Sequence, residues 1–424
     1  MILQRLIILY FLLLILEGAL RKWFLPGLAT PLLLVRDPVV LMIYFIALRQ
    51  GMFPINSWVG GAVLLSVVGS LLTLTVGHGN AAVLAYGIRA NFLQIPLIFI
   101  IGQTMDRQTL RIVVRCLLWL SIPMTVLIAL QYFSAPEARV NVGVGGEGTA
   151  SFDGIGGRHR PSGTFSFITG LVAFYTFVFA AWLAALFDKR HASPVLLALS
   201  GVAILAAIPL SISRLLLVSV ALVALGSAAA FIRMPRWGRQ LPRLILVIGV
   251  SVLVTSQLPF FDEAVDIMGQ RVDEAARIEG GSAGFTRRIG MDLFGPFIHS
   301  EFDPSGAGLG AGTQGGSQML VGERGFQGGE GEWWRLLFEM GTILGTFFIV
   351  MRFWLTVRLG LCGWRMLSVA NPLPWLFFLA CGLLVLNGQW GQPTALGFTI
   401  LGAGMTIAAA RLGINEQNQP DTAQ

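Results

Sequence analysis

Continuous apolar runs of about twenty residues recur along the whole of this chain, beginning at residues 2–20. A helix needs roughly 17–25 predominantly apolar residues to cross a bilayer. Only 12% of the 424 residues are charged, whereas an average soluble domain carries about 25%. The mean hydropathy is +0.75. The pattern predicts an all-α polytopic membrane protein, because a β-barrel would show short alternating segments instead.

We count twelve predicted spans, in three groups separated by two long connections. The spans are residues 2–20, 28–48, 58–77, 80–101, 110–132, 164–187, 195–212, 214–232, 244–258, 334–357, 372–389 and 394–410. The long connections are residues 133–163 and residues 259–333. Residues 411–424 are predicted to form a disordered cytoplasmic tail.

Basic residues in the short connections predict the orientation. They gather at residues 188–190, 233–243 and 352–365, and positively charged short loops stay in the cytoplasm. Both termini are therefore predicted to be cytoplasmic and both long connections to face outward. The first run is followed by Arg21, Lys22 and Trp23 rather than a small-residue cleavage site, which predicts a retained helix. Nucleic acid is not a predicted partner, because the net charge of +7 is spread over these loops.

The connection 259–333 differs in composition from the rest of the chain. It has twelve acidic residues and five arginines and so a net charge of −7. Because the whole chain carries +7, the rest of the chain carries +14. It also contains seventeen glycines, which disfavour regular helix and let the backbone approach a ligand. Helical spacing in its first half predicts short external helices before the glycine-rich stretch.

Several arginines fall where a bilayer or its outer face is expected, and such residues usually mark a pathway or a site. They are Arg36 next to Asp37, Arg89, Arg214 between two spans, and the pair Arg287 and Arg288. Simpler interpretations stay open: Arg36 neutralising Asp37, Arg89 reaching an interface, and Arg214 as an interfacial anchor. Together the arginines favour an anion site, since a guanidinium group binds phosphate oxygens with two parallel hydrogen bonds.

Four motifs occur in a characteristic order: "RHRPSGTFSFITGLVAFY", "SISRLLLVSVALVAL", "TRRIGMDLFGPF" with "GAGLGAG", and "GEGEWWRLLFEMGTILG". In this order, over residues 155–350, the chain resembles the O-antigen ligase and Wzy-type polymerase superfamily. The resemblance implies a bacterial inner-membrane glycosyltransferase of GT-C-like fold with a large periplasmic loop between spans 9 and 10.

The resemblance also implies a substrate and roles for individual residues. A glycan is carried on undecaprenyl pyrophosphate, an acceptor hydroxyl attacks its anomeric carbon, and the lipid pyrophosphate leaves. Arg214 and Arg288 match the family arginines that bind the pyrophosphate, and Arg160 is a further candidate. Arg36, Arg89, Arg158 and Arg287 complete the candidate substrate-binding set. No cofactor is implied, and a chain-length regulator is a possible partner.

One departure from the family concerns the catalytic base. Ligase-type members have a histidine about eleven residues before the glycine of the final "ExG", and the matching position here is Glu330. We therefore predict Glu330 as the base, with Glu332 as a second candidate. A carboxylate in a partly dry site can accept a hydroxyl proton. The alternative is that both acids complement the dipole of the next helix. Trp333 and Trp334 are interpreted as an interfacial belt, with stacking on sugar rings as the alternative.

The sequence does not favour a metal or disulfide site. Glu301 and Asp303 have a spacing that occurs in divalent-metal sites, but a single acidic pair in an acidic loop is common by chance, and arginines stabilise a leaving pyrophosphate without metal. The three cysteines, an odd number, lie in or beside apolar runs.

The leading functional prediction is a polymerase of lipid-linked oligosaccharide repeat units. A ligase that transfers finished glycan to a lipid A-core or other acceptor is the nearest alternative, and the missing histidine favours the polymerase. A twelve-helix transporter is a different class, suggested by "GQTMDRQTLR" at residues 102–111. No internal repeat supports it. A non-catalytic assembly subunit is the third class.

Overall fold

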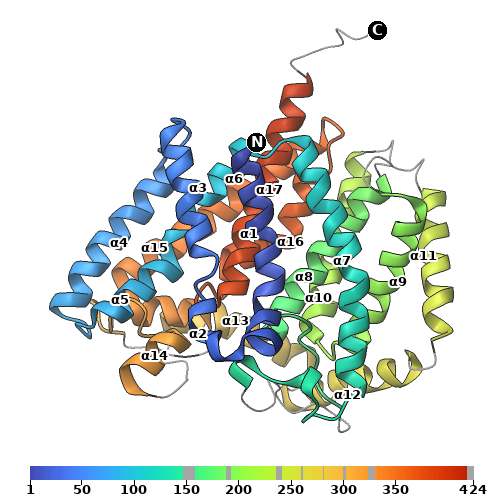
Figure 1. The fold of residues 1–424 in the computed structure, drawn as a ribbon, viewed down its shortest axis with the longest axis horizontal. Coiled ribbons are helices and arrows are strands. Elements are labelled where there is room, and N and C mark those ends of the chain that lie inside the picture. Colours follow the sequence, from blue (N-terminus) through green and yellow to red (C-terminus); the bar gives the residue numbers. More distant parts are fainter. Residues whose placement is uncertain are drawn as a thin grey trace.

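The computed structural model is a bundle of helices (Figure 1). It describes residues 1–146, 158–187, 192–234, 241–258, 261–279, 281–298, 302–322, 329 and 331–417. Within these ranges eight helices are long and apolar enough to cross a membrane, and one further pair passes the same test with a bend of 97° between its members. Three shorter apolar helices accompany them. The chain is therefore a multi-pass helical membrane protein.

Every predicted span coincides with one of these helices. The eight long spans are α1 (Ile2–Ala19) continued by the π-helix η1 (Leu20–Phe24); η2 (Pro26–Leu28), α2 (Ala29–Leu32) and α3 (Asp37–Arg49); α4 (Ser57–Thr75); α5 (Ala81–Ile88), the π-helix η3 (Arg89–Leu93) and α6 (Ile95–Thr104); α7 (Arg107–Phe133); α8 (Ile168–Phe187); α15 (Glu332–Leu367); and α17 (Pro393–Gln417). The shorter helices are α9 (Pro194–Leu210), α10 (Arg214–Arg233) and α16 (Leu373–Asn387), and the bent pair is α11 (Leu241–Ser256) with α12 (Phe261–Glu279).

Polar residues at the ends of the apolar runs determine where several helices begin. The Asn56 side chain accepts hydrogen bonds from the amides of Trp58 and Val59 at the start of α4. Asp106 caps α7 and Ser193 caps α9 in the same way. Such caps satisfy amides that have no partner within the helix.

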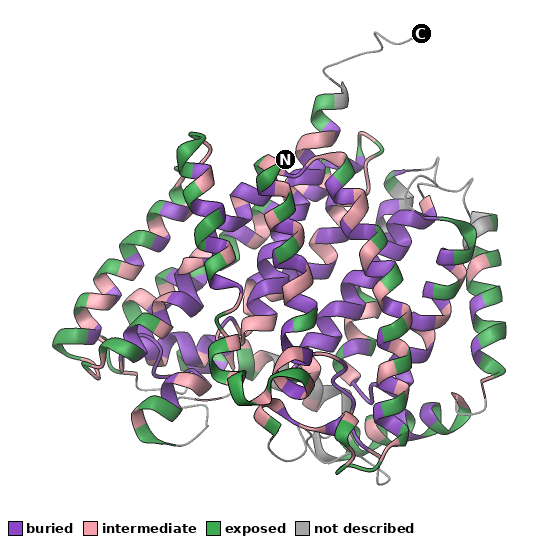
Figure 2. Cartoon of the chain, in the orientation of Figure 1, coloured by how far each residue is buried: buried purple, intermediate pink, exposed green. Residues whose placement is uncertain are grey.

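Two helices form the centre of the bundle. In α8 and α17, 89% and 83% of the most apolar window is buried, whereas α4 buries 28% of its window. Figure 2 shows this gradient, with buried residues concentrated in the central helices and exposed ones along α4 and α11. The exposed apolar side chains of the outer helices suit contact with lipid.

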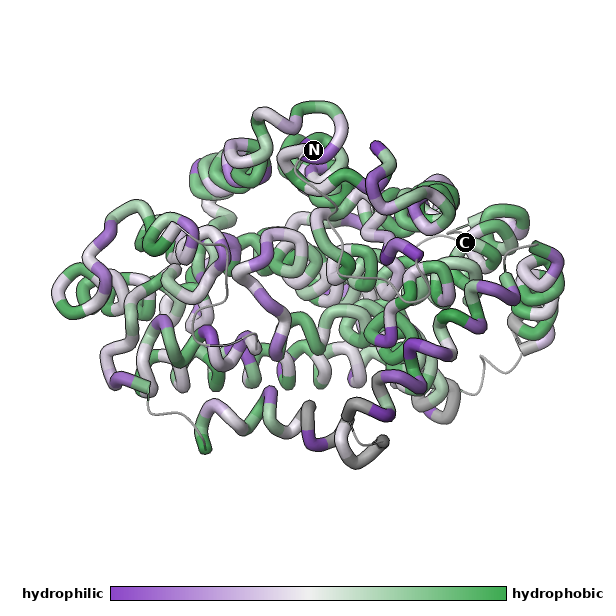
Figure 3. The backbone as a smooth tube through the Cα atoms, turned by 90° about the horizontal axis from the view of Figure 1, so that it is seen from below, coloured by the Kyte–Doolittle hydropathy of each residue, from purple (hydrophilic) through white to green (hydrophobic). Residues whose placement is uncertain are grey.

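The chain runs back and forth between two ends of the bundle. The N-terminus and the end of α17 lie at one end, together with the turn between α3 and α4 (Figure 1). The other end carries α2, α12, α13 (Gly281–Ile298) and α14 (Gln314–Val321). Figure 3 views the molecule from that end, where hydrophilic residues are interspersed along apolar segments. The helices α12 and α13 occupy the half of the connection 259–333 where external helices are predicted.

The second, fourth and tenth predicted spans are interrupted within the bundle. The second span breaks between α2 and α3, where Pro38 stands in the first turn of α3. The fourth changes to π-helix at η3. The helix α15 is interrupted at Gly341, whose φ of 73° and ψ of 176° are not helical. Irregular backbone at membrane depth is tolerated where protein or a polar cavity surrounds it.

The glycine-rich residues 302–313 run between α15 and the ends of α4 and α5. The amide of Ala307 donates to the Phe338 carbonyl at 2.8 Å, and the His78 amide donates to the Ala307 carbonyl at 3.1 Å. The Leu309 amide donates to the Thr73 hydroxyl at 3.0 Å. The sequence suggests that glycine here lets the backbone approach a ligand. In the structure the backbone instead approaches other helices, because this segment is largely buried.

Two sequence-based boundaries are wrong. The helix α17 continues to Gln417, so residues 411–417 of the predicted disordered tail are helical, and the rest of that tail lies outside the described residues. The helix α15 extends to Leu367, so the basic residues 352–365 lie on a helix rather than in a short loop. Arg352 among them is fully buried.

Candidate functional site

A cavity of about 1010 Å³ lies towards the end of the bundle that carries α2 and α14. This volume is at the upper limit of roughly 300–1,000 Å³ that is usual for ligand pockets. Residues of η1, η3, α14 and α15 contribute to its wall, together with the connection between α16 and α17. The interruptions of the second and fourth spans both border it, through Leu33, Asp37 and Arg89.

Each of the three arginines on the wall pairs with an acidic residue that is also on the wall. The pairs are Arg21 with Glu17 at 3.5 Å, Arg335 with Glu332 at 2.8 Å, and Arg89 with Asp37. Arg89 also donates from Nη2 to the Leu33 carbonyl at 2.8 Å. A buried charge needs such a partner, because its desolvation is costly.

The interpretation that Arg36 neutralises Asp37 is wrong. Arg36 Nε donates to Glu17 Oε2 at 2.9 Å, while Asp37 pairs with Arg89. Adjacent residues on a helix point in different directions, so neighbours in sequence do not face each other. Arg36 is fully buried and also donates from Nη2 to the Pro393 carbonyl at 2.7 Å.

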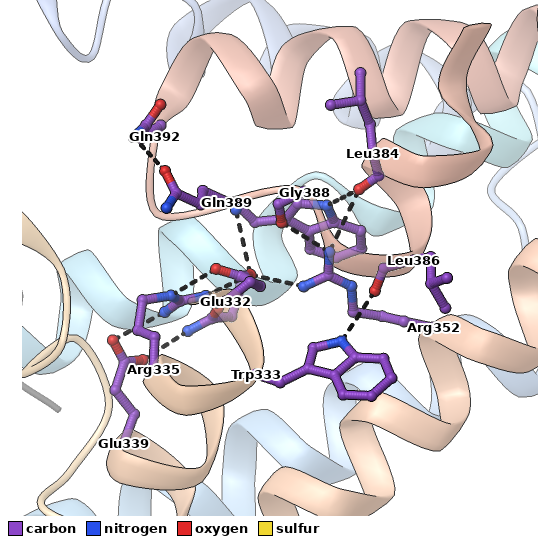
Figure 4. A network of polar contacts seen from close by, with 12 residues as sticks. Glu332, Trp333, Arg335, Glu339, Arg352, Leu384, Leu386, Gly388, Gln389 and Gln392 are labelled. Atoms are coloured by element: carbon purple, nitrogen blue, oxygen red, sulfur yellow. Dashed lines mark hydrogen bonds and ion pairs between the residues drawn. The ribbon is translucent and has the colours of Figure 1, made fainter. Parts of the chain in front are cut away.

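A second buried network surrounds Glu332 at the start of α15 (Figure 4). Arg335 donates to both oxygens of Glu332, at 2.8 and 2.9 Å, and Arg352 Nη1 donates to Oε1 at 2.6 Å. Arg335 also donates to Glu339 at 2.8 Å and to Asn91 at 2.8 Å. All five residues are nearly inaccessible.

The same network fixes residues 388–392, which join α16 to α17 and which we call the glutamine loop. Arg352 donates from Nη2 to the Gly388 carbonyl at 2.8 Å. The Trp390 amide donates to Glu332 Oε1 at 3.2 Å. Gln389 and Gln392 both line the cavity, and Gln392 Nε2 donates a hydrogen bond to Gln389 Oε1. Figure 4 shows both glutamines on this loop, next to Glu332 and Arg335.

A group of arginines lies outside the cavity. Burial lowers the pKa of Arg160, and the positive charges of Arg271 and Arg214 lower the pKa further. The Nε of Arg160 is buried and has no hydrogen-bond partner among the described residues. We call Arg160, Arg214 and Arg271 the cationic cluster. They come from three chain segments, and an anion bound among them would relieve their mutual repulsion.

Residues 158–167 connect the cationic cluster to the cavity. At one end Arg158 pairs with Glu263 of α12. In the middle the buried Lys22 donates to the Ser162 hydroxyl at 2.7 Å. Ser166, on the cavity wall, accepts a hydrogen bond from Arg21 at 3.3 Å.

The remaining predicted residues are distributed as follows. Glu330 lies outside the described residues. Arg287 and Arg288 lie on α13, where the side chain of Arg287 is exposed and that of Arg288 is outside the description. Arg287 does not line the cavity. Of the predicted residues, Arg160 and Arg214 lie close enough for their charges to interact, Arg89 and Glu332 line the cavity, and Arg36 contacts its wall at Glu17 and Pro393.

The geometry disfavours Glu332 as a general base. Both of its oxygens accept hydrogen bonds from Arg335, and one accepts a third from Arg352. Two neighbouring guanidinium groups stabilise the ionised carboxylate and so oppose proton uptake. The alternative that Glu332 only complements a helix dipole is also incomplete, because this side chain is the centre of a buried network.

Several residues of the site are absent from the sequence-based prediction. Arg335 and Arg352 pair with the predicted Glu332, and Glu17 pairs with the predicted Arg36. A signal was present for Glu332 and Arg335, because acidic and basic residues three positions apart share one helix face. The pairing of Glu17 with Arg36 joins two different spans and has no local signal.

Trp333 does not lie in an interfacial belt. Its side chain is buried, and Nε1 donates to the Leu386 carbonyl at 3.3 Å. Trp334 packs edge-on against Phe302 with ring centroids 5.9 Å apart. Neither tryptophan lines the cavity, so neither is placed to stack on a ligand there.

The acidic pair considered for a metal is only partly described. Glu301 lies outside the described residues. Asp303 accepts hydrogen bonds from the hydroxyl and amide of Ser305, and these lower the pKa of its carboxyl group. Its contacts are those of a residue that stabilises a turn.

No known protein family, curated protein or solved structure matches the chain. Its function is therefore inferred from the two features above. One is a cavity whose charged groups are paired, and the other is the cationic cluster, in which Arg271 Nη1 also pairs with Glu274 Oε2 at 3.2 Å. Residues 158–167 run between them.

Proposed function

We propose that this protein is a membrane-embedded glycosyltransferase that polymerises oligosaccharide repeat units carried on undecaprenyl pyrophosphate. The product would be an O-antigen or exopolysaccharide, made at the periplasmic face of a bacterial inner membrane. The observation that carries the proposal is the cationic cluster. Arg160 and Arg214 match motifs of the polymerase and ligase superfamily, and Arg160 Nε is buried without a hydrogen-bond partner among the described residues. Burial, and then the positive charges of Arg271 and Arg214, lower the pKa of Arg160.

The cationic cluster suits the leaving group of this reaction. When the acceptor hydroxyl attacks the anomeric carbon, the bond from that carbon to the diphosphate oxygen breaks and the lipid diphosphate leaves with its negative charge. Guanidinium groups arranged in advance stabilise that charge more in the transition state than in the substrate. Three arginines supply several hydrogen-bond donors for phosphate oxygens.

The hydroxyl proton must pass to a base during the attack. Glu332 is unsuited to this role, so Glu330 is the acidic residue that we propose as the base. Changing Glu330 to glutamine removes its capacity to accept the proton and keeps the size of the side chain.

The alternation of the helices supports the twelve-span, GT-C-like topology. The shorter helices α9, α10 and α16 have 17, 20 and 15 residues. At 1.5 Å per residue they extend roughly 22–30 Å, close to the thickness of the bilayer core. With the basic loops in the cytoplasm, both termini are cytoplasmic and the cavity and cationic cluster are periplasmic.

The test is the size profile of surface glycan in a strain that lacks the gene and carries single variants of it. Arg160→Ala or Arg214→Ala should reduce long-chain glycan about 10- to 150-fold, because a hydrogen bond to a charged group contributes roughly 1.5–3 kcal/mol. Arg358→Ala is the matched control, since Arg358 is exposed on α15. Immunoblots of membranes check that each variant is inserted.

The form of the intermediate distinguishes the related activities. A defective polymerase leaves single lipid-linked repeat units, whereas a defective ligase leaves long lipid-linked chains. Unchanged long-chain glycan in both arginine variants would contradict the assignment of the cationic cluster. A polymerase of this type can act with a chain-length regulator, and loss of that partner would alter the chain-length distribution without abolishing polymerisation.

A further inference from the structure

The charges on the cavity wall cancel. Three arginines and three acidic residues line it, and each arginine is paired with one of the acids. Behind the wall, Arg36 and Arg352 add two positive charges and Glu339 adds one negative charge. Nine ionised groups therefore leave a single positive charge, which is poor compensation for a diphosphate.

The guanidinium donors of Arg335, on the wall, and of Arg352, behind it, are also occupied. Arg335 directs contacts from all three nitrogens to Glu332, Glu339 and Asn91. Arg352 directs its contacts to Glu332 and to the backbone carbonyls of Leu384, Val385 and Gly388. An anion would have to replace these contacts to bind, and would leave buried acceptors without a partner.

The wall is instead rich in neutral hydrogen-bonding groups. Gln389 and Gln392 reach it from the glutamine loop, and the Thr169 hydroxyl donates to Gln392 Oε1 at 2.9 Å. Gln314 and Gln318 of α14 face the same cavity. Each primary amide has two donor hydrogens and two acceptor lone pairs, so Gln392 keeps one of each beyond its contacts with Gln389 and Thr169. Such groups match sugar hydroxyls, which both donate and accept.

The wall also has flat apolar surfaces. Tyr86 and Phe167 line the cavity, and the Arg89 guanidinium lies over the Tyr86 ring at 5.6 Å. An aromatic ring offers a rigid face at little cost in conformational entropy. A sugar ring presents C–H groups on one face and hydroxyls around its edge, so amides and aromatic faces together suit it.

We infer that this cavity binds uncharged sugar residues of the glycan, and that Gln389 and Gln392 are its principal hydrogen-bonding ligands. The buried arginines Arg36 and Arg352 are positioning residues, because their contacts with backbone carbonyls at both ends of the glutamine loop hold that loop against the cavity. The inference rests on the proposed function and assigns the two parts of the substrate to two sites. The cationic cluster holds the diphosphate and the cavity holds the sugar.

The experiment measures binding of two separate probes to the purified full-length protein in detergent by titration calorimetry. One probe is the free oligosaccharide released by mild acid from the lipid-linked repeat unit of the source strain, with its phosphate removed. The other is sodium pyrophosphate. The double variant Gln389→Ala with Gln392→Ala should weaken oligosaccharide binding about tenfold or more, since two hydrogen bonds are lost, and should leave pyrophosphate binding unchanged.

The control variants separate binding from folding. Arg160→Ala should weaken pyrophosphate binding and leave oligosaccharide binding unchanged. Gln392→Met removes the amide while nearly preserving side-chain shape, and should weaken only oligosaccharide binding. Gln108→Ala, at an exposed glutamine outside the cavity, should change neither.

Two results would overturn the inference: no binding of the oligosaccharide to the unaltered protein, or glutamine variants that bind it as tightly as the unaltered protein does. Either result leaves the polymerase proposal to be judged by the glycan profile. Conversely, glutamine-dependent oligosaccharide binding together with a normal glycan profile in the deletion strain would support the sugar site and refute the polymerase.

Discussion

Arg352 illustrates how single charged side chains are stabilised inside this bundle. Its Nε donates to the Val385 carbonyl at 2.9 Å, and its other nitrogens contact Glu332 and two further carbonyls. Its guanidinium group also lies 4.0 Å from the centre of the Trp390 ring. Removing one partner of such a buried pair is strongly destabilising, by roughly 3–5 kcal/mol, because the other charge remains buried. These arginines therefore serve structure first, and a loss of activity in their variants needs a stability control.

The buried side chain of His159 predicts that the stability of the folded protein depends on pH. Burial, and then the positive charge of Lys22, lower the pKa of its imidazole below the usual value of about 6.5. The unfolded chain then binds the proton more readily, so stability is full above pH 6.5 and falls as pH drops from there towards the folded pKa. Melting temperatures in detergent between pH 7.5 and 5.5 should decline less in His159→Gln than in the unaltered protein. Equal declines would show that other groups cause the effect.

Among the elements, two interrupted spans, the second and the fourth, border the cavity. Regular helices leave no main-chain groups for ligands, whereas the breaks near Arg36, at η3 and at Gly341 bring polar groups into the bundle. At Gly341 the carbonyls of Phe338 and Glu339 accept hydrogen bonds from Ala307 and Gly308 of the glycine-rich segment. The break in α15 therefore has a definite packing partner.

The variant Gly341→Ala tests this element. The φ of Gly341 is 73° with ψ of 176°, a region essentially restricted to glycine, and an added Cβ would contact the Pro304 carbonyl. We expect a loss of about 3 kcal/mol or more, seen as a lower melting temperature and less protein in membranes. Gly249→Ala is the control, because Gly249 lies on α11 with no atom near the position of an added Cβ. A Gly341→Ala protein as stable as this control would contradict the role given to the break.

The sequence predicted the elements better than the site, for physical reasons. Apolar runs report helix length directly, so each predicted span coincides with a helix. Runs of similar composition nevertheless form both the enclosed α8 and the exposed α4, because hydropathy does not distinguish lipid from protein neighbours. Residues such as Arg36 and Glu17 pair across spans, and only the tertiary arrangement determines that pairing. Motifs singled out Arg160 and Arg214 as individual candidates but not their position near Arg271, whereas Gln389 and Gln392 carry no charge and gave no signal.

For the molecule as a whole, the regular alternation of helices gives a testable topology. The turn between α3 and α4 lies at the end that carries the N-terminus, and the chain leaves α7 at the opposite end (Figure 1). Gln50 belongs to that turn, and Glu137 to the segment after α7. On a background without the three native cysteines, Glu137→Cys should react with a membrane-impermeant maleimide in intact spheroplasts. Gln50→Cys should react only after permeabilisation. Reaction of both without permeabilisation would contradict the alternation.

The route of the glycine-rich segment has a consequence for how the protein is made. His78 Nε2 contacts the Leu309 carbonyl at 3.1 Å across 231 positions of the chain. At synthesis rates of about 5–20 residues per second, the first partner waits roughly 10–50 seconds for the second. The contacts of this segment with the ends of α4 and α5 are thus completed late in biogenesis, and a nascent chain halted before residue 302 would enter the bilayer without them.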